Sequence, residues 1–391
     1  MALPCLSHTN RIPPDGEGKA VKRCHGGFHD TATEDPGSLT GIVCPTWHSC
    51  AVDSPVVLVI DGNSLVHRSF HAMAESSQPD WAVRGLLTQL VAAVDRVRPT
   101  AVVVGFDDAD RSHRRERWRQ YKANRIEKLP SLVSQLAGAV AVMRELGLAV
   151  VVPHGLEADD VSASAAALAR QAGGRSVIVT SDRDAFALID EHTSVLRIIN
   201  GGVDASPLLT PERLMLLLGV RPEQYRDFAA LRGDPSDNLP GVRGVGPRTA
   251  ARLLAAFGSA AAAFADLDAV RERLGAGVAT RLSADGARAA WELNCQIMTM
   301  HDDVPLGTDL VAGPGVLPVP AECVDAVFAA HRLVWTAGRA AHLLAGAPEA
   351  TPRPRPPEPW AERPVLRRRE RRRTVPRAAA LVPAVDQLSL F

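Results

Sequence analysis

Acidic side chains follow four separate apolar runs of this chain, at the point where each run ends. The runs are "VVLVI" (56–60), "AVVVGF" (101–106), "AVVVP" (149–153) and "SVIVTS" (176–181). The acids that follow them are Asp61, Asp107, Glu157, Asp159, Asp160, Asp182 and Asp184. A single aspartate after a strand is most often a turn or helix-cap residue. That explanation is poor for the whole set, because converging carboxylates raise one another's pKa steeply unless a cation neutralises them.

The ligand chemistry of this set favours a hard cation. No histidine or cysteine recurs with the acids, and carboxylate oxygens are the ligands that Mg²⁺ or Mn²⁺ prefers. Seven carboxylates exceed what one Mg²⁺ needs, since that ion keeps several waters. Two ions roughly 4 Å apart would use them, holding the attacking water and the leaving oxygen of a phosphodiester hydrolysis. The set therefore predicts two metal ions and a phosphate-rich substrate.

A basic segment follows the second apolar run. "DADRSHRRERWRQYKANR" carries six arginines and one lysine, interleaved with Trp118 and Tyr121. A charge run is usually a solvated helix face, and we interpret Arg111, Arg117 and Arg119 in that way. The remaining basic residues start beside the acid set, and the aromatic rings could stack on unpaired bases. This segment therefore predicts single-stranded nucleic acid passing over the metal site.

The pattern of apolar runs predicts an α/β domain. Five β-branched runs, the four above and "SVLRII" (194–199), alternate with segments of helical spacing. Such a pattern indicates a parallel sheet with helices on both faces, in which ligands bind at the carboxyl ends of the strands. From about Thr210 helices separated by Gly and Pro take over, beginning with a capped helix that has Pro211 in its first turn. We expect a second, helical domain there.

Composition and charge constrain the rest of the chain. Net charge is zero over 391 residues, yet residues 351–377 hold ten arginines and three glutamates, so the remainder carries −7. A neutral total therefore does not argue against a nucleic-acid partner. Apolar runs long enough for a membrane span, a secretory signal and CxxC pairs are all missing from the sequence. We expect a cytoplasmic, nucleoid-associated protein with no membrane partner, acting as a monomer.

Five ordered blocks resemble the signature blocks of the 5′ nucleases. They are "VIDGNSLVHRSFHA", "GFDDADRSHRRERWRQYKANR", "GLEADDVSASAA", "VTSDRDAFAL" and "LRGDPSDNLPGVRGVGPRTA", across roughly residues 55–310. That family includes the N-terminal nuclease domain of bacterial DNA polymerase I, free-standing 5′-3′ exonucleases and flap endonucleases. The resemblance implies a PIN-like sheet domain followed by a helix–three-turn–helix domain that grips duplex DNA. It also implies metal-dependent cleavage of DNA at a 5′ end or flap.

The resemblance assigns roles residue by residue. It implies a first metal cluster of Asp61, Asp107, Glu157 and Asp159, and a second of Asp160, Asp182, Asp184, Asp234 and Asp237. It implies that Arg114 and Lys122 are the basic pair directed at the scissile phosphate. It implies that Gly244 and Gly246 form the turn that holds the uncut strand, commonly with a K⁺ ion. The further DNA-binding residues expected are Arg68, Arg115, Tyr121, Arg125, Arg248 and Thr249.

The end of the chain resembles a short peptide that docks bacterial proteins on the β sliding clamp. In "QLSLF", Leu388, Leu390 and Phe391 would fill an apolar groove while Gln387 forms hydrogen bonds. An apolar end folded back on the protein is the alternative. Because nothing long enough for a polymerase follows the nuclease blocks, we expect a free-standing nuclease.

These expectations divide the chain into six segments. They are a disordered leader (1–54), a PIN-like catalytic domain (55–209), a helix–three-turn–helix domain (210–310), a packing segment (311–345), a disordered Pro/Arg-rich tail (346–386) and a clamp-binding peptide (387–391). Two alternatives stay open for function. One is a non-catalytic, clamp-tethered DNA-binding scaffold, and the other is a PIN-type RNase that acts on structured RNA.

Overall fold

The computed structural model describes residues 54–72 and 80–349. The expected leader, apart from its last residue, lies outside the described residues. So do the expected clamp-binding peptide and the expected tail from residue 350 onward. Nothing in the described part of the chain forms a helix that is both long and apolar enough to cross a membrane.

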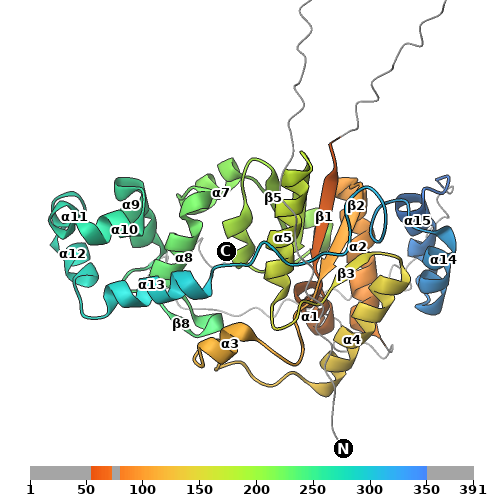
Figure 1. The fold of residues 1–391 in the computed structure, drawn as a ribbon, viewed down its shortest axis with the longest axis horizontal. Coiled ribbons are helices and arrows are strands. Elements are labelled where there is room, and N and C mark those ends of the chain that lie inside the picture. The colour runs from red at the N-terminus through yellow and green to blue at the C-terminus, as the bar shows by residue number, and fades with distance from the viewer. Residues whose placement is uncertain (1–53, 73–79, 350–391) are drawn as a thin grey trace, which may run out of the picture. The chain divides into compact units, whose positions relative to one another are not determined.

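A six-stranded sheet forms the centre of the first domain (Figure 1). Its strands are β1 (Val56–Asp61), β2 (Ala101–Gly105), β3 (Ala149–Val151), β4 (Arg175–Thr180), β5 (Thr193–Arg197) and β6 (Leu208–Leu209). They lie in the order β3-β2-β1-β4-β5-β6, and β1 to β5 are parallel. The prediction of a parallel sheet from five apolar runs is therefore confirmed. The short β6, which pairs antiparallel with β5, was not predicted, because two residues carry no periodic signal.

Alternating side chains of each strand enter two different cores. Val57 and Val59 of β1 pack in one core with α5 (Ala158–Gln171), and Leu58 and Ile60 pack in the other. The second core also takes the apolar faces of α1 (Gly62–Ala72), α2 (Trp81–Val97) and α4 (Pro130–Glu145). Because both faces of β1 are covered, the strand sequence is continuously apolar rather than alternating.

The strand order reverses between β1 and β4, and this reversal leaves room for a site. The crossovers from β1 lead away to β2 and β3 on one side, whereas β4 and β5 lie on the other. In open parallel sheets the crevice at such a reversal, outside the carboxyl ends of the strands, is the usual ligand site. Asp61 ends β1, and Asp182 follows β4 by two residues, so both carboxylates stand at this crevice.

The remaining elements of the first domain are short. They are α3 (His113–Arg117), the 3-10 helix η1 (Asp184–Leu188) and α6 (Gly202–Ala205). Ser112 caps α3 by accepting a hydrogen bond from the Arg115 N–H. The basic segment predicted after β2 is therefore helical only at its start, and its residues from Trp118 to Leu129 run as turns and coil.

The second domain is helical, as predicted. Its elements are α7 (Pro211–Leu218), η2 (Pro222–Gln224), α8 (Tyr225–Arg232), β7 (Gly233–Asp234), η3 (Pro235–Asp237), β8 (Leu239–Pro240), α9 (Pro247–Phe257), α10 (Ala260–Ala265), α11 (Leu267–Leu274), α12 (Ala276–Leu282) and α13 (Ala287–Ile297). Thr210 caps α7 through the Arg213 N–H, which confirms the predicted helix start. The hairpin of β7 and β8 and the three short helices α10 to α12 were not predicted.

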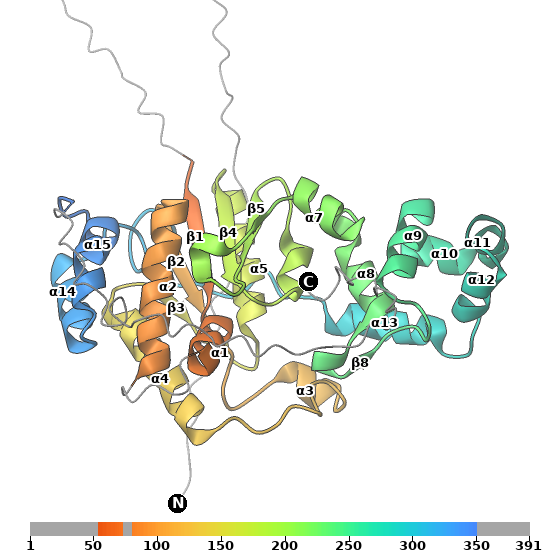
Figure 2. The ribbon, with the colours of Figure 1, turned by 180° about the vertical axis from the view of Figure 1, so that it is seen from behind.

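Two helices follow the five signature blocks in the chain and pack on the first domain. They are α14 (Ala321–Ala330) and α15 (Val334–Ala345), and their buried residues join the core that contains α2 and α4. Arg339 of α15 forms a bidentate ion pair with Asp95 of α2, at 2.6 and 3.0 Å. Figure 2 shows α15 beside α2. The segment 311–345 thus supplies part of the sheet domain's core.

Candidate active site

A cleft of about 900 Å³ opens at the carboxyl ends of β1 and β4. Acids from distant parts of the chain reach it. Those that line it are Asp61, Asp107, Glu157, Asp159, Asp182 and Asp234. Asp184 and Asp237 line a small cavity of about 10 Å³, which Glu157 and Asp159 also line. The structure therefore brings eight of the nine predicted metal ligands to one place.

Asp61 and Asp107 are held by hydrogen bonds, most of them from distant parts of the chain. Thr180 of β4 donates its hydroxyl to Asp61 Oδ2 at 2.6 Å, and the Ser64 N–H donates to Asp61 Oδ1 at 2.9 Å. Asp107 accepts from the Ala158 N–H at 3.0 Å and from the Asn63 amide. Burial is the largest cause that raises the pKa of both carboxyls, and it brings that of Asp61 to about 7.

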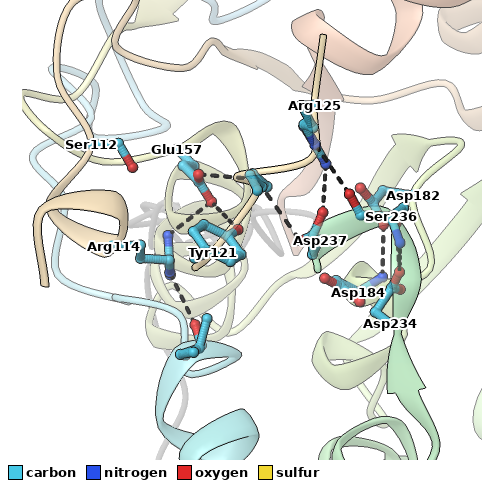
Figure 3. Close-up of polar contacts among 12 residues, drawn as sticks. Ser112, Arg114, Tyr121, Arg125, Glu157, Asp182, Asp184, Asp234, Ser236 and Asp237 are labelled. Carbon is cyan, nitrogen blue, oxygen red and sulfur yellow. Dashed lines mark hydrogen bonds and ion pairs between the residues drawn. The ribbon is translucent and has the colours of Figure 1, made fainter. Parts of the chain in front are cut away.

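Glu157 collects donors from the basic segment. Its carboxylate accepts from the Tyr121 hydroxyl at 2.9 Å, from Lys122 Nζ at 3.0 Å and from Arg114 at 3.2 Å. Figure 3 shows the Arg114 and Tyr121 side chains turned toward Glu157. Glu157 is also the N-cap of α5, and its N–H donates to Asp160 at 3.0 Å. Acids at a helix N-terminus accept hydrogen bonds from its free N–H groups. The side chains of Glu157 and Asp160 are therefore positioned by the start of α5.

The other acids lie on the side of β4 and of the second domain. Burial, followed by repulsion from Asp182, raises the pKa of Asp184 to about 8. Asp234 accepts from the Ser236 N–H at 2.8 Å. Asp237 is buried and pairs with Arg125 at 2.6 Å, and Lys122 Nζ lies 4.0 Å from it (Figure 3). Burial is the largest cause that raises the pKa of Asp237.

The residues of the cleft fit hard divalent cations by their donor chemistry. All eight acids offer oxygen, and burial together with mutual repulsion raises the pKa of five of them, which are Asp61, Asp107, Asp159, Asp184 and Asp237. Cations placed among them would relieve this repulsion. As the side chains stand, no three His, Cys, Asp or Glu groups of the described residues are arranged to hold an ion. Binding would therefore require rotation of carboxylates whose present partners include Lys122 and Arg125.

Asp160 was predicted to be a metal ligand, but in the structure it does not line the cleft. Its side chain is fully buried, and its two oxygens accept from Arg114 at 2.6 and 2.7 Å. The N–H groups of Glu157 and His301 complete its partners. Asp160 lines neither the cleft nor the small cavity. Because α5 turns successive residues by about 100°, Asp159 faces the cleft while Asp160 faces the second domain.

Arg114 was predicted to contact the scissile phosphate, but in the structure it is buried and bound to other parts of the protein. Only 8% of the residue is exposed, and it binds acids and backbone carbonyls of the protein itself. Lys122, the other member of the predicted pair, does line the cleft, as does Arg125. Lys122 has a left-handed backbone (φ 54°), and its N–H donates to the Asp237 carbonyl at 2.9 Å. Within the predicted basic segment, the residues that line the cleft are therefore Lys122 and Arg125.

Tyr121 was predicted to stack on unpaired bases, but in the structure it is buried. Its ring is 95% buried against Leu239 and Ile297, and its hydroxyl is used by Glu157. Among the other predicted DNA-binding residues, Arg68 lines the cleft and donates to Asn200 at 3.1 Å. Arg115 is exposed on α3.

The predicted duplex-gripping turn lies on the surface of the second domain. Gly244 is exposed and has φ +79°, and an added Cβ would come within 3.0 Å of Arg281 Nε. Gly246 is the N-cap of α9, Arg248 is exposed in the first turn of that helix, and Thr249 is partly buried. Free N–H groups at such a turn can bind phosphate. Arg281 on α12 was missed, because only the fold brings it to Gly244.

Several other cleft residues were not predicted as site residues. They are Asn63, Ser64, His67, His71, Lys128, Ser181, Arg183, Asn200 and Arg232. Two of them had a local signal, since Asn63 follows Asp61 closely and Arg183 separates two predicted ligands. The histidines of α1 had none. Burial, followed by the charge of Lys128, lowers the pKa of His67 to about 4, so this ring is neutral at physiological pH.

Two family models match consecutive parts of the chain. The model described as 5′-3′ exonuclease, N-terminal resolvase-like domain, matches residues 56–215, and that described as 5′-3′ exonuclease, C-terminal SAM fold, matches residues 220–314. DNA polymerase I of Mycobacterium tuberculosis is 37% identical over 258 residues, which cover 64% of this chain and 28% of that protein. The thermostable DNA polymerase I of Thermus aquaticus is 36% identical over 261 residues, covering 65% and 29%. The chain thus matches less than a third of the length of these relatives.

Solved structures agree on the fold. The 5′-exonuclease of bacteriophage T5 with bound zinc has a TM-score of 0.50 and 20% identity, covering 70% of this chain and 93% of that one. The flap endonuclease of the same phage, in a complex with DNA and metal ions, has a TM-score of 0.50 and 19% identity over the same shares. Together the two family models match more than half of the chain, in the order expected from the five blocks. The chain belongs to the 5′-3′ exonuclease family.

Proposed function

We propose that this protein is a metal-dependent 5′ nuclease that hydrolyses DNA phosphodiesters at 5′ ends and flaps, including RNA-primed ends, in replication and repair. One observation carries the proposal. Eight carboxylates from five segments of the chain line one cleft and the small cavity that shares Glu157 and Asp159 with it, and Lys122 and Arg125 line the cleft as well. A phosphodiester with divalent cations supplies the opposite charges that both groups of side chains need.

The carboxylates divide between two Mg²⁺ or Mn²⁺ sites. Asp61, Asp107, Glu157 and Asp159 lie near the ends of β1 to β3 and are suited to hold the first ion. The second ion would be held by Asp182, Asp184, Asp234 and Asp237. Bound ions would activate the attacking water and stabilise the leaving oxygen.

The chain's own residues orient the substrate. Lys122 and Arg125 contact Glu157 and Asp237 in this structure, and a phosphate entering the cleft would offer both cations a second acceptor. Thr180 and Ser64 keep Asp61 turned toward the cleft through their hydrogen bonds. Arg68 and Arg183 also line the cleft and add positive charge there.

The decisive measurement is cleavage of end-labelled 5′-flap DNA with Mg²⁺ or Mn²⁺. We expect cutting near the flap junction that a chelator abolishes. Asp182→Ala should remove cleavage but leave DNA binding, measured by fluorescence anisotropy, close to that of the unchanged protein. Full cleavage by Asp182→Ala would rule the proposal out.

The same assay separates the alternatives. A wild-type protein that binds but never cuts flap, nicked or gapped DNA in either metal would be the non-catalytic scaffold. Faster cutting of an RNA flap than of a DNA flap of the same sequence would favour the PIN-type RNase.

The exposed Gly244 turn is the part of the second domain suited to the uncut duplex. Backbone carbonyls of this turn would hold a K⁺ ion, which would supply positive charge for a DNA phosphate. Replacing K⁺ by Na⁺ at constant ionic strength should weaken duplex binding. Arg248→Gln should weaken it in both salts, by a similar factor for different sequences, because a phosphate contact carries no sequence information.

The C-terminal "QLSLF" is the proposed contact with a β sliding clamp, on the strength of its sequence alone. Deleting residues 387–391 should abolish binding of the full chain to a purified clamp, measured by anisotropy, while flap cleavage without the clamp is unchanged. Such tethering would place the enzyme on DNA in the nucleoid. Undiminished clamp binding by the truncated chain would contradict the assignment.

A further inference from the structure

Arg114 has no donor left for a substrate. An arginine side chain carries five N–H donors in a rigid fork. Nε donates to the Ile297 carbonyl at 3.1 Å. One terminal nitrogen donates to Asp160 and Glu157, at 2.7 and 3.2 Å, and the other to Asp160 and the Thr299 carbonyl, at 2.6 and 2.9 Å. These five contacts match the five donors.

The five acceptors of Arg114 belong to two domains. Glu157 and Asp160 lie at the start of α5, directly beside the acidic cleft. Ile297 is the last residue of α13, and its carbonyl is one of those that a helix leaves without an intrahelical partner. A buried cation at this end also interacts favourably with the helix dipole. Arg114 therefore joins the cleft to the C-terminus of a helix in the second domain.

Helix α13 is in turn tied to the segment that leads to the Gly244 turn. Asn294 is buried, and its amide donates to the carbonyls of Ala230 at 3.0 Å and Pro240 at 2.9 Å. Ile297 packs with Leu239, the residue directly before Pro240. Pro240 precedes Gly244 by four residues. A continuous series of contacts thus runs from the cleft through Arg114 and α13 to the turn.

We propose that Arg114 is a positioning residue that sets the distance between the acidic cleft and the Gly244 turn, and thereby the position of the cut. The inference rests on the proposed function, because it needs the turn to hold DNA and the cleft to cut it. Loss of the Arg114 fork would free the end of α13 and let the turn shift relative to the cleft. DNA would still bind, but the bond presented to the cleft would vary.

Two variants test this, with one matched control. Arg114→Lys keeps the charge but cannot reach acceptors on both Asp160 and α13. The double variant Arg114→Gln with Asp160→Asn removes both charges together, so that no buried charge is left unpaired. Arg119→Gln removes one arginine from the exposed part of the same segment and serves as the control.

The first readout is the distribution of cut positions on end-labelled 5′-flap DNA. Wild type and the control should share one dominant position, whereas both Arg114 variants should cut at several neighbouring positions. Because misplacement by about 1 Å can cost roughly a hundredfold in rate, kcat should fall by about that factor while KM changes little. An unchanged dominant position with a raised KM would show that Arg114 contacts phosphate, and would overturn the proposal.

The second readout does not depend on cleavage. Hydrogen exchange of the His301 amide, which donates to Asp160, and of the neighbouring amides 298–300 should be faster in both variants than in the control. This measurement decides the connection even if the wild-type protein cuts no DNA, in which case the proposed function alone has failed. Unchanged exchange in folded variants would overturn the connection. If the double variant does not fold, Arg114→Lys still provides both readouts.

Discussion

Asp159 and Asp160 are neighbours in the chain but lie in opposite electrostatic surroundings. Asp159 faces Asp182, Asp61 and Asp184, and burial together with these charges raises its pKa well above the ordinary value. Asp160 is held by Arg114, whose hydrogen bonds and charge lower its pKa despite burial. One acid is thus poised for a cation from outside, and the other already has one from the protein.

Replacing each of these acids by its amide should change stability in opposite directions. Asp159→Asn should stabilise the metal-free protein at neutral pH, because the amide requires neither a bound proton nor a buried charge among like charges. Asp160→Asn should cost about 3 kcal/mol, since it leaves the Arg114 cation buried without its main partner. Urea unfolding with a chelator measures both free energies. Equal effects would contradict the assignment of the two carboxylates to different environments.

The acidic cleft should make the metal-free protein less stable as pH rises. Burial raises the folded-state pKa of Asp61 to about 7 and that of Asp184 to about 8, from an ordinary value of 3.8. Between about pH 4 and pH 8 the folded state therefore retains protons that the unfolded chain has released. Stability contributed by these groups is complete below that window and is lost across it.

Unfolding in urea at about pH 5 and about pH 8, with a chelator, checks this dependence. We expect a lower midpoint at the higher pH, and saturating Mg²⁺ should remove most of the difference. A midpoint that rises with pH would show that the carboxylates are not crowded as described.

Among the elements, the link from β8 to α9 contains the Gly244 turn and follows the acids Asp234 and Asp237 closely in the chain. The Val242 N–H donates to the Leu231 carbonyl at 2.9 Å, and Gly241 approaches Arg232 so closely that an added Cβ would lie 2.3 Å from its carbonyl carbon. Such close packing leaves one register for the link. The acids Asp234 and Asp237 precede it directly, so acid and glycine are joined here at a fixed separation.

Inserting a second glycine directly after Gly241 should move or spread the position of the cut before it weakens DNA binding. The insertion changes the distance between the turn and the cleft but leaves the turn's own N–H groups intact. Cut positions on end-labelled flap DNA and the Kd for duplex, measured on the same preparation, check this. A weakened Kd with an unmoved cut would show that the link serves binding alone.

At the scale of the whole molecule, the sheet domain depends on residues beyond the matched family models. Those models end at residue 314, yet Val324, Phe328 and Leu344 are fully buried in the core beneath α2 and α4. The acidic cleft and this packing lie on the same sheet, so the C-terminal helices support the strands that present the acids.

Phe328→Ala should destabilise the protein by about 3–5 kcal/mol, because it opens a cavity in a closed core. Trp335→Ala on the neighbouring helix is the control, since 62% of that residue is exposed and its change should stay within about 0.5 kcal/mol. Chemical denaturation measures both. Similar small effects would show that α14 and α15 pack independently of the sheet.

Local patterns of residues were enough to predict the sheet domain and the acids at its strand ends. Buried parallel strands must be continuously apolar, and their carboxyl ends meet at one edge, so Asp61, Asp107 and Asp182 could be placed together from five runs and their order. The Thr210 cap was equally local. These features depend on short stretches of chain, which is why periodicity and spacing were enough.

Which charged groups face the cleft, and which join the two domains, depends on contacts between distant parts of the chain. Arg114 meets its acceptors across 43 to 185 residues of chain, and Tyr121 is buried by Leu239 and Ile297 from the second domain. Nothing local distinguishes Arg114 from Arg115, or Asp160 from Asp159. Their roles follow from which side of α3 and α5 the second domain covers, and that depends on long-range packing.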